Sequence, residues 1–437
     1  MIAVIVMKIL LVGNGAREHV IAKRIAEDAE LYAVMSKKNP AIARLSKKYW
    51  ITDIHSPEAV AKALEGEKFD ICFASPDATL AAGISDALEK FGAVASPSKK
   101  AARIEWDKSF ARMLAEKYKI EGSPKLRLVR TTEEAKKAIE EIGEVAVKPL
   151  GLTGGKGVKI SGEHFSSFNE IGDYIKELLS NEGAVLIEEK LIGEEFTLQA
   201  FSDGKNLAFM PPVQDHKRAF EGDVGPNTGG MGSYSTGELL PFLTRKDLDA
   251  AKKIMKKTIA ALEKEGAPFK GVLYGQFMAT ADGVKVIEFN SRFGDPEAMN
   301  VLVLLKDSLS GILEKIAAQK LTKAAFEKKC TVVKYLVPEG YPDNPKKDAE
   351  VMIDEQAIAN AGAEVYYASV YENDGKIYTT SSRAFGIVGI AEKIEDAEKI
   401  AEKGCSFVSG PVWHRRDIGT NALIEKRIER MKKLRGR

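Results

Sequence analysis

A lysine followed by a glycine-rich loop is the first feature of this sequence that could bind a ligand. Residues 145–160 are VAVKPLGLTGGKGVKI, in which Lys148 ends an apolar run typical of a β-strand. The loop behind it contains Gly154, Gly155, Lys156 and Gly157. Glycines let backbone N–H groups close around phosphate oxygens, and a lysine on a strand can hold a phosphate as a fixed charge. We therefore expect a phosphate site, with a flexible surface hairpin as the less favoured alternative.

Three oxygen-bearing side chains share one face of a predicted hairpin further along the chain. In GVLYGQFMATADGVKVIEFN the pair Asp282-Gly283 marks the turn. Glu288 and Asn290 are two residues apart and project from the same face, and Gln276 lies across the hairpin from them. Such oxygens suit hard cations such as Mg²⁺ or Mn²⁺, which also bind phosphates. An ordinary amphipathic hairpin is the alternative, but it does not account for the charged NSRFGDPE that follows.

Acidic and basic residues lie beside these two motifs. Glu188 and Glu189 end one predicted strand, and Glu194 and Glu195 begin another. A carboxylate there could bind the ribose hydroxyls of a nucleotide, although a solvated acidic edge explains the pattern equally well. Arg292 follows the predicted metal ligands and could hold the charge that develops on a transferred phosphate.

A long polar segment, residues 214–235, lies between regions with regular apolar patterns. Loops of this length within compact domains are usually functional or disordered, and Met231 and Tyr234 argue against disorder. His216 by itself is expected to be a hydrogen-bonded structural residue. The residues that could offer donors or charge to an anionic substrate are Asp215, Lys217, Arg218, Asn227, Thr228 and Gly229.

The chain opens with a predicted strand and a glycine turn, GNGAREH. Gly13, Asn14 and Gly15 lie where a helix is expected to start, which favours an anion. A dinucleotide fingerprint would require a glycine near position 18, where Glu18 stands, and an acid at the end of the second strand, where residues 35–37 are Met-Ser-Lys. A nicotinamide cofactor is therefore disfavoured, and a smaller phosphate ester is expected.

The composition excludes several classes of protein. The 437 residues include 65 Lys and Arg against 63 Asp and Glu, a net charge of +2, and are 44% hydrophobic. This balance disfavours a nucleic-acid binder and a disordered chain. Cys72, Cys330 and Cys405 form neither a disulfide framework nor a metal motif, which favours a reducing, cytoplasmic setting. The apolar opening is interpreted as a first strand, too short to span a membrane.

The order of predicted elements places these motifs. Up to about residue 100, strands at 8–13, 31–36 and 69–75 alternate with helices at 17–28, 40–50 and 79–90, a pattern typical of a doubly wound parallel sheet. Residues 125–190 indicate strand, helix, strand, glycine loop, helix and strand, the size of a small lid. The last hundred residues indicate a strand-rich domain with a basic terminal helix.

These motifs resemble the ATP-grasp ligases, and more closely the phosphoribosylamine-glycine ligase family. The resemblance rests on GNGAREH, SPSKKAARIEWDKSF, VKPLGLTGGKGV, QDHKR, GPNTGGMGSYS, GVLYGQFM, VIEFNSRFGDPE, GYP and RRDIG, which occur in the family's order. It implies condensation of glycine with 5-phosphoribosylamine in purine biosynthesis, through a glycyl phosphate. ATP is the implied co-substrate, with Mg²⁺ or Mn²⁺.

The resemblance also implies roles for particular residues. Those expected at the nucleotide are Lys108, Lys148, Gly154, Gly155, Lys156, Gly157, Glu188 and Glu195. Those expected at the metal are Gln276, Glu288 and Asn290, although many family members have an apolar residue at position 276. The catalytic candidates are Arg292, Asp295 and Lys217. The candidates for binding substrates are Gly13, Asn14, Gly15, Asp215, Arg218, Asn227, Thr228, Gly229 and Glu297.

The implied architecture has three domains of mixed α/β and α+β type. They are an N-terminal substrate-binding domain (1–103), an ATP-grasp domain (104–330) with a lid at about 124–192, and a C-terminal domain (331–437). The loop from Ser75 to Leu80 departs from the family pattern, which permits an ATP-grasp ligase with a different carboxylate and amine. A regulatory nucleotide-binding protein or oxidoreductase is a third possibility that leaves the predicted metal ligands unexplained. The oligomeric state stays open, with a monomer as one option.

Overall fold

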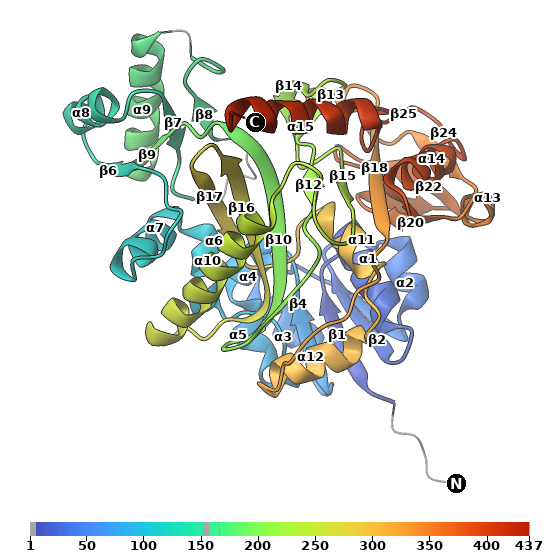
Figure 1. Ribbon diagram of the computed structural model, residues 1–437. Helices are drawn as coiled ribbons and strands as arrows, with labels where there is room; N and C mark the ends of the chain where they lie inside the picture. The colour runs from blue at the N-terminus through green and yellow to red at the C-terminus, as the bar shows by residue number, and fades with distance from the viewer. Residues whose placement is uncertain (1–5, 152–156, 166, 437) are drawn as a thin grey trace.

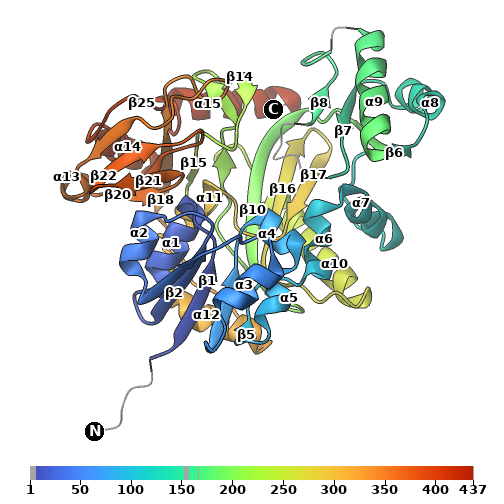
Figure 2. The same ribbon diagram turned by 180° about the vertical axis from the view of Figure 1, so that it is seen from behind.

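The computed structural model describes residues 6–151, 157–165 and 167–436, which form six sheets (Figure 1). They are an N-terminal parallel sheet, a lid sheet, a central antiparallel sheet, two C-terminal sheets and a two-stranded hairpin. Seen from behind, the N-terminal sheet with its helices fills the lower part of the molecule (Figure 2). No helix among the described residues is long and apolar enough to cross a membrane.

The N-terminal sheet confirms the predicted doubly wound arrangement, with five parallel strands in the order β3-β2-β1-β4-β5. Its strands are β1 (Lys8–Val12), β2 (Glu30–Met35), β3 (Lys48–Ile51), β4 (Ile71–Ala74) and β5 (Ala93–Val94). Its helices are α1 (Ala16–Ile25), α2 (Pro40–Leu45), α3 (Pro57–Ala63), α4 (Asp77–Ala82) and α5 (Ile84–Leu88). Strand β1 is buried from its second residue onward, as expected for a sheet covered on both faces.

Two predicted helices of this domain differ from the structure. The helix expected at 40–50 ends at Leu45, and its last residues form the edge strand β3, whose Tyr49 and Trp50 are favoured in strands. The helix expected at 79–90 is divided at Gly83, which has a φ of +96° and forms the C-cap of α4. A left-handed residue cannot continue a right-handed helix.

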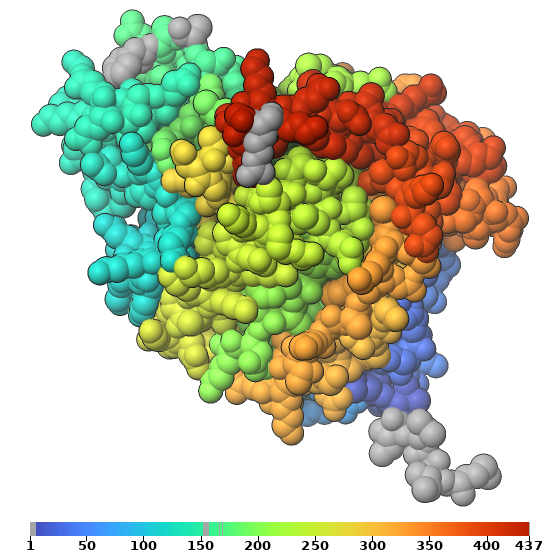
Figure 3. Space-filling view, in the orientation of Figure 1, coloured from blue at the N-terminus to red at the C-terminus, as the bar shows by residue number. Residues whose placement is uncertain are grey.

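The lid has the predicted strand, helix, strand, loop, helix and strand, with one further short strand between the loop and the second helix. Helices α6 (Lys99–Trp106) and α7 (Lys108–Lys117) lead into it. It consists of β6 (Leu126–Val129), α8 (Thr132–Ile142), β7 (Val145–Lys148), β8 (Lys159–Ile160), α9 (Phe168–Glu182) and β9 (Val185–Glu189). The strands pair antiparallel in the order β6-β9-β7-β8. The lid is a lobe at one edge of the molecule, and it has a hydrophobic core of its own that includes Val147, Ile175 and Ile187 (Figure 3).

The central sheet contains the predicted hairpin. It has the order β11-β10-β16-β17, formed by β10 (Gly193–Asp203), β11 (Leu207–Phe209), β16 (Lys270–Thr280) and β17 (Gly283–Asn290). Gly283 has a φ of +116°, a conformation that glycine adopts readily at this turn. The long helix α10 (Arg245–Lys264) packs on β16 and β17. The predicted opposition of Gln276 and Glu288 is confirmed.

The segment 214–235 is not the irregular loop that its composition predicts. It forms four short strands, β12 (Gln214–Asp215), β13 (Arg218–Phe220), β14 (Val224–Asn227) and β15 (Gly232–Ser235). Strand β15 pairs with β18 (Cys330–Pro338), and β13 pairs with β14. Short polar strands escape a prediction based on apolar alternation, because their stability comes from pairing with segments distant in sequence.

The rest of the chain is strand-rich and ends in a helix, as predicted. One sheet has the order β12-β15-β18-β23-β20 with β25 beside β18, and a second has the order β21-β22-β19-β24. The further strands are β19 (Glu350–Ile353), β20 (Ala363–Tyr367), β21 (Val370–Asn373), β22 (Lys376–Thr379), β23 (Phe385–Ala391), β24 (Val408–Ser409) and β25 (Val412–Trp413). The helices are α11 (Glu297–Leu302), α12 (Leu309–Ala317), α13 (Glu355–Asn360), α14 (Ile394–Cys405) and α15 (Asn421–Leu434). One continuous core joins the N-terminal, central and C-terminal sheets.

Candidate active site

One face of the central sheet carries polar side chains from three adjacent strands. Alternation along each strand puts these residues on the same face. They are Glu195, Thr197 and Gln199 on β10, Tyr274 and Gln276 on β16, and Glu288 and Asn290 on β17. Thr197 lies opposite Gln276, which in turn lies opposite Glu288. The structure therefore brings the three predicted metal ligands together with Glu195, whose Oε2 accepts a hydrogen bond of 2.6 Å from Gln276 Nε2.

A lysine ammonium lies among the carboxylates above this face. Lys217 Nζ is 3.5 Å from Glu195 Oε2. Burial lowers the pKa of Lys217, but the charges of Glu195 and Glu288 and, less strongly, those of Asp215 and Glu297 raise it above its ordinary value. Lys217 is therefore a fixed positive charge at the centre of the predicted substrate and metal residues.

The donor set of this face fits a hard divalent cation. Burial raises the pKa of Glu288, but the cations around it, Lys217 first, lower it below its ordinary value, so the side chain is an anionic oxygen donor. Among the described residues, no group of three or more His, Cys, Asp or Glu side chains is arranged to hold a metal. A metal here would therefore need the amide oxygens of Gln276 and Asn290, and phosphate oxygens, beside Glu288.

A narrow cavity between α7, the lid and β17 holds the predicted nucleotide lysines. Its lining combines apolar Ile104, Leu186 and Phe289 with the cations Lys108 and Lys148. An apolar slot next to two ammonium groups suits a purine base joined to phosphates. Lys108 and Lys148 come from different elements, the start of α7 and the end of β7, so only the fold brings them to one cavity.

Glu188 has partners that the sequence did not reveal. It is 1% exposed, and its carboxylate accepts from Arg112 at 2.6 and 3.0 Å and from Lys148 at 2.7 Å. Arg112 also donates to the carbonyl oxygen of Ile287 at 2.8 Å. With both oxygens engaged, Glu188 orients Lys148 and is not free to face a ribose. Glu195, with a side chain 45% exposed, is the more accessible of the two predicted nucleotide acids.

Both ends of the glycine loop are tied to neighbouring elements. Gly154, Gly155 and Lys156 lie outside the described residues. On one side of them, Lys108 Nζ donates to the carbonyl oxygen of Gly151 at 2.6 Å. On the other side, the hydroxyl of Tyr174 donates to the carbonyl oxygen of Gly157 at 2.6 Å. The loop therefore leaves the lid strand β7 next to the nucleotide lysine of α7 and re-enters the lid next to Tyr174 of α9.

The three acidic or basic residues after β17 are each fixed by a partner. Arg292 NH2 is 2.9 Å from Glu105 Oε1. Asp295 accepts from Arg383 at 2.9 Å and from the Tyr335 hydroxyl. Glu297 is buried and accepts from the Tyr274 hydroxyl at 2.8 Å and from Thr197 at 3.1 Å. Arg292 and Glu297 thus border the polar face, whereas Asp295 points toward the C-terminal sheet.

Asp215 is a partly buried acid without a full set of partners. Its Oδ1 atom is buried and has no hydrogen-bond partner among the described residues. Burial, together with Glu297, raises the pKa of Asp215 well above its ordinary value, against the influence of Lys217. A cationic or hydrogen-bonding ligand group would complete this environment, because an unpaired buried acceptor is costly.

The other predicted substrate residues of segment 214–235 are engaged locally. Thr228 donates from its backbone and its hydroxyl to the carbonyl oxygen of Lys217, at 2.7 and 2.8 Å. Gly229 accepts from Arg383 at 2.7 Å. Arg218 lies opposite Asn227 and pairs with Glu163 of the lid at 2.7 Å. Thr228 and Gly229 therefore shape the turn, and Arg218 reaches toward the lid.

The N-terminal glycine turn differs from the free anion site that its sequence predicts. Glu18 Oε2 accepts from the Gly15 N–H at 2.7 Å, and Glu18 Oε1 accepts from Ser75 at 2.6 Å. Asn14 Oδ1 accepts from the hydroxyl of Ser36 at 2.9 Å. The anion at the start of α1 is therefore the protein's own Glu18 carboxylate, which accepts from the N–H of the N-cap residue Gly15. The spacing Gly15-x-x-Glu18 was a local signal for it.

Several functional candidates escaped the sequence argument. Arg383 holds Asp295 and two turn carbonyls, although it is 88 residues away from Asp295 in sequence. Glu105 holds Arg292. Neither has a spacing that would reveal its role. Arg112 was detectable, because it lies four residues after Lys108 on the same face of α7.

Sequence profiles of a known enzyme family cover nearly the whole chain. The phosphoribosylglycinamide synthetase N domain matches residues 7–105, its ATP-grasp (A) domain residues 106–298, and its C domain residues 331–421. The chain belongs to the phosphoribosylglycinamide synthetase family. A phosphoribosylamine-glycine ligase of Methanosarcina acetivorans is 52% identical over 438 residues, with 98% of each chain covered. One of Pyrococcus abyssi is 49% identical over 432 residues, again with 98% of each covered.

Solved structures agree with the assignment of this chain to the phosphoribosylglycinamide synthetase family. The crystal structure of a Thermotoga maritima phosphoribosylamine-glycine ligase has a TM-score of 0.81 at 27% identity, covering 94% of this chain and 99% of that one. A biotin carboxylase of Campylobacter jejuni has a TM-score of 0.72 at 14% identity, which shows the shared ATP-grasp fold alone. Glu18 lies in the part of the chain matched by the N domain, Glu288 in the part matched by the ATP-grasp (A) domain, and Arg383 in the part matched by the C domain.

Proposed function

We propose that this chain joins glycine to 5-phosphoribosylamine and converts ATP to ADP and phosphate. The observation that carries the proposal is the polar face of the central sheet, where nucleotide lysines, oxygen ligands and Lys217 meet in a chain that aligns over 98% of its length with ligases of this name. The alternative carboxylate or amine suggested by the loop from Ser75 to Leu80 gains no support from these relatives.

We assign the ATP phosphates to Lys108, Lys148 and the loop from Gly154 to Gly157, and the ribose to Glu195. The positions of Lys108 and Lys148 around one cavity support the assignment of the phosphates, since a purine needs an apolar slot and its phosphates need cations. Glu188 then acts through Lys148, which it holds at 2.7 Å.

We assign Mg²⁺ or Mn²⁺ to Glu288 and Asn290, with Gln276 as a further ligand. When bound, such a cation neutralises charge on the phosphate oxygens during transfer. The adjacency of Gln276 and Glu288 and the anionic state of Glu288 support this choice.

In the proposed reaction an oxygen of the glycine carboxylate attacks the γ-phosphorus, and the bond to the β-phosphate oxygen breaks to release ADP. The amine of 5-phosphoribosylamine then attacks the carbonyl carbon of glycyl phosphate, phosphate leaves, and the amine loses a proton. Arg292 and Lys217 are fixed charges that stabilise the transferred phosphate. Asp215 is proposed to bind the glycine ammonium group, which would supply its Oδ1 with a donor.

The boundaries of the three domains are part of the proposal. We place them at residues 1–103, 104–330 and 331–437, with a lid at about 124–192. The core of the lid is separate, which supports a unit that moves as one body. Strands β12 and β15 precede residue 330 in the chain but pair into the sheet of the third domain. The boundary at residue 330 therefore separates two domains in the sequence, while this sheet contains strands from both sides of it.

The test is ADP release with glycine and 5-phosphoribosylamine formed in situ, next to a panel of other amino acids. Turnover that requires glycine supports the proposal. Turnover with another amino acid and none with glycine would reject the substrate, and absence of ATP turnover with every amine and acid would reject the ligase reaction.

A further inference from the structure

An arginine of the last helix contacts two carboxylates behind the proposed active site. Helix α15 runs across the end of β10, and most of it lies beyond the region matched by the family's C domain (Figure 1). Arg427, with a side chain 15% exposed, donates to Glu194 at 3.0 Å through one terminal nitrogen. Its other terminal nitrogen pairs with Asp223. A single planar guanidinium thus joins β10 to the turn of the β13–β14 hairpin.

Each of these two carboxylates is linked to one member of the ion pair between Lys217 and Glu195 in the proposed active site. Glu194 and Glu195 are adjacent in β10, so their side chains project from opposite faces of the sheet. Asp223 accepts from His216 Nδ1 at 3.4 Å, and His216 is the residue before Lys217. Glu194, the first anchor of Arg427, is therefore the residue before Glu195. Asp223, the second anchor, contacts His216, which is the residue before Lys217.

We propose that Arg427 is a positioning residue that holds both Lys217 and Glu195 from behind the sheet. The inference rests on the proposed function, because it gives Lys217 and Glu195 their roles. Arg427 touches no reacting group. Its effect is to fix the backbone of two distant segments relative to each other, and a displacement of about 1 Å in a catalytic geometry can cost about a hundredfold in rate.

Neighbouring ion pairs should allow the protein to fold when Arg427 is replaced. Asp223 keeps Arg415, whose terminal nitrogen lies at 3.0 Å, and Glu194 keeps Arg430 at 3.2 Å. The end of the helix keeps the bidentate contact of Arg435 with Asp247, at 2.8 Å for both bonds. Loss of Arg427 therefore leaves α15 attached and removes the one side chain, within the described part of the chain, that contacts both Glu194 and Asp223.

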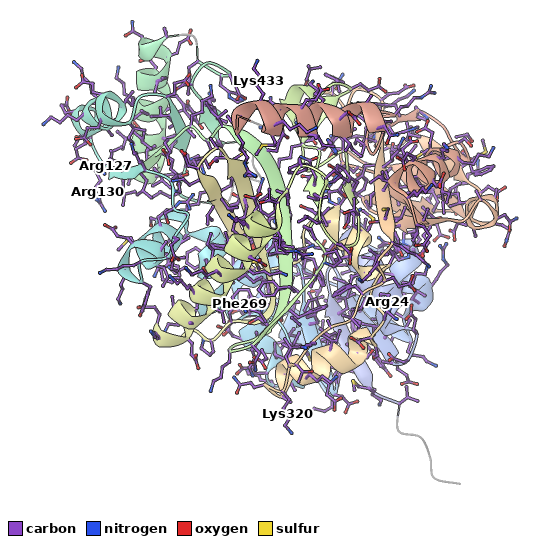
Figure 4. The ribbon with its side chains drawn as sticks, viewed as in Figure 1. Arg24, Arg127, Arg130, Phe269, Lys320 and Lys433 are labelled. Atoms are coloured by element: carbon purple, nitrogen blue, oxygen red, sulfur yellow. The ribbon has the colours of Figure 1, made fainter. Side chains whose placement is uncertain are left out.

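The test compares Arg427→Met with Arg430→Met, which loses a cation from Glu194 alone, and with Lys433→Met. Lys433 is exposed on the outer side of α15 (Figure 4). We expect Arg427→Met to lower kcat by between about tenfold and a hundredfold and to raise KM for ATP, because Glu195 is assigned to the ribose. A smaller folded fraction would lower kcat but could not raise KM for ATP. Both control variants should match the parent.

Two further measurements keep the outcome decisive. If Arg427→Met does not fold, Arg427→Lys carries the test, because it keeps the charge but cannot bridge both carboxylates; parent-like kcat and KM in a folded Arg427 variant overturn the inference. If the parent itself shows no glycine-dependent ADP release, the proposed function fails. Crystal structures of parent and variant then decide the inference: an unchanged separation of Lys217 Nζ and Glu195 Oε2, 3.5 Å in the parent, refutes it.

Discussion

Gln276 lies directly opposite Glu288 in the β16–β17 pair and donates to Glu195 of β10 at 2.6 Å. One amide thus connects the predicted metal ligand of one strand to the predicted nucleotide acid of another. The three strands place these side chains side by side because all of them project from one sheet face. The variants below test this arrangement, the nucleotide site and the stability of the fold.

Glu288→Gln should abolish metal-dependent turnover while the fold persists. The substitution keeps the size of the side chain and removes the charge that we assign to Mg²⁺ or Mn²⁺. A loss of between about a hundredfold and a thousandfold in kcat is expected, as for the removal of a strong electrostatic contact in a transition state. ADP release measured over a range of Mg²⁺ concentrations checks this, with exposed Asp282→Asn on the same hairpin as control. Parent-like turnover in Glu288→Gln would remove Glu288 from the ligand set.

Lys148→Ala should weaken the binding of ATP while the protein still folds. A hydrogen bond to a charged group contributes about 1.5–3 kcal/mol, which corresponds to a loss of affinity between about tenfold and a hundredfold. Titration calorimetry with ATP measures it, and Lys176→Ala on the exposed side of α9 is the matched control. An unchanged dissociation constant would contradict the phosphate role of Lys148.

Glu188→Gln should destabilise the protein by about 3 kcal/mol, because it leaves Arg112 and Lys148 as buried cations without their shared anion. Urea denaturation at neutral pH gives the free energy of unfolding. The double variant with Arg112→Met should recover part of the loss, since one of the two unpaired charges is then absent.

The pH dependence of this ion pair has a definite sign. Burial raises the pKa of Glu188, but Arg112 and Lys148 lower it below the ordinary value of 4.5. Its stabilisation is therefore full above pH 4.5 and is lost as the pH falls below that value. The stabilities of parent and Glu188→Gln should converge in acid, and a constant difference between them would contradict the ion-pair explanation.

His19 should make the fold sensitive to mild acid. Burial, with smaller contributions from Lys23 and Arg44, lowers its pKa to about 3 from 6.5, and its Nδ1 accepts from the Tyr367 N–H at 2.9 Å. Because the pKa of His19 is lower in the folded than in the unfolded protein, the neutral side chain stabilises the fold fully above pH 6.5. This stabilisation is lost as the pH falls from 6.5 toward 3. From pH 7 to pH 5 the parent should lose about 2 kcal/mol more than His19→Gln. Urea denaturation checks this, with exposed His55→Gln as control, and equal losses would contradict it.

Local patterns account for much of the candidate site. The turn at Asp282-Gly283 sets the register of the hairpin, so the opposition of Gln276 and Glu288 follows from counting residues. The strand that ends in Lys148 and the order of lid elements follow from apolar patterning. The contact between Glu18 and the Gly15 N–H is also local, but the glycine turn alone predicts an open anion site, because glycine spacing does not show which carboxylate occupies it.

The sequence by itself determined the strands that carry Lys148, Gln276 and Glu288 and their facing, because alternation and turn chemistry act over a few residues. Tertiary structure alone decided that Glu188 is held by Arg112, that Asp295 is held by Arg383, and that Arg427 reaches the back of β10. These contacts join segments that are up to 233 residues apart. No local pattern specifies such pairs, because they form only when buried charges from separate domains must find partners in the same core.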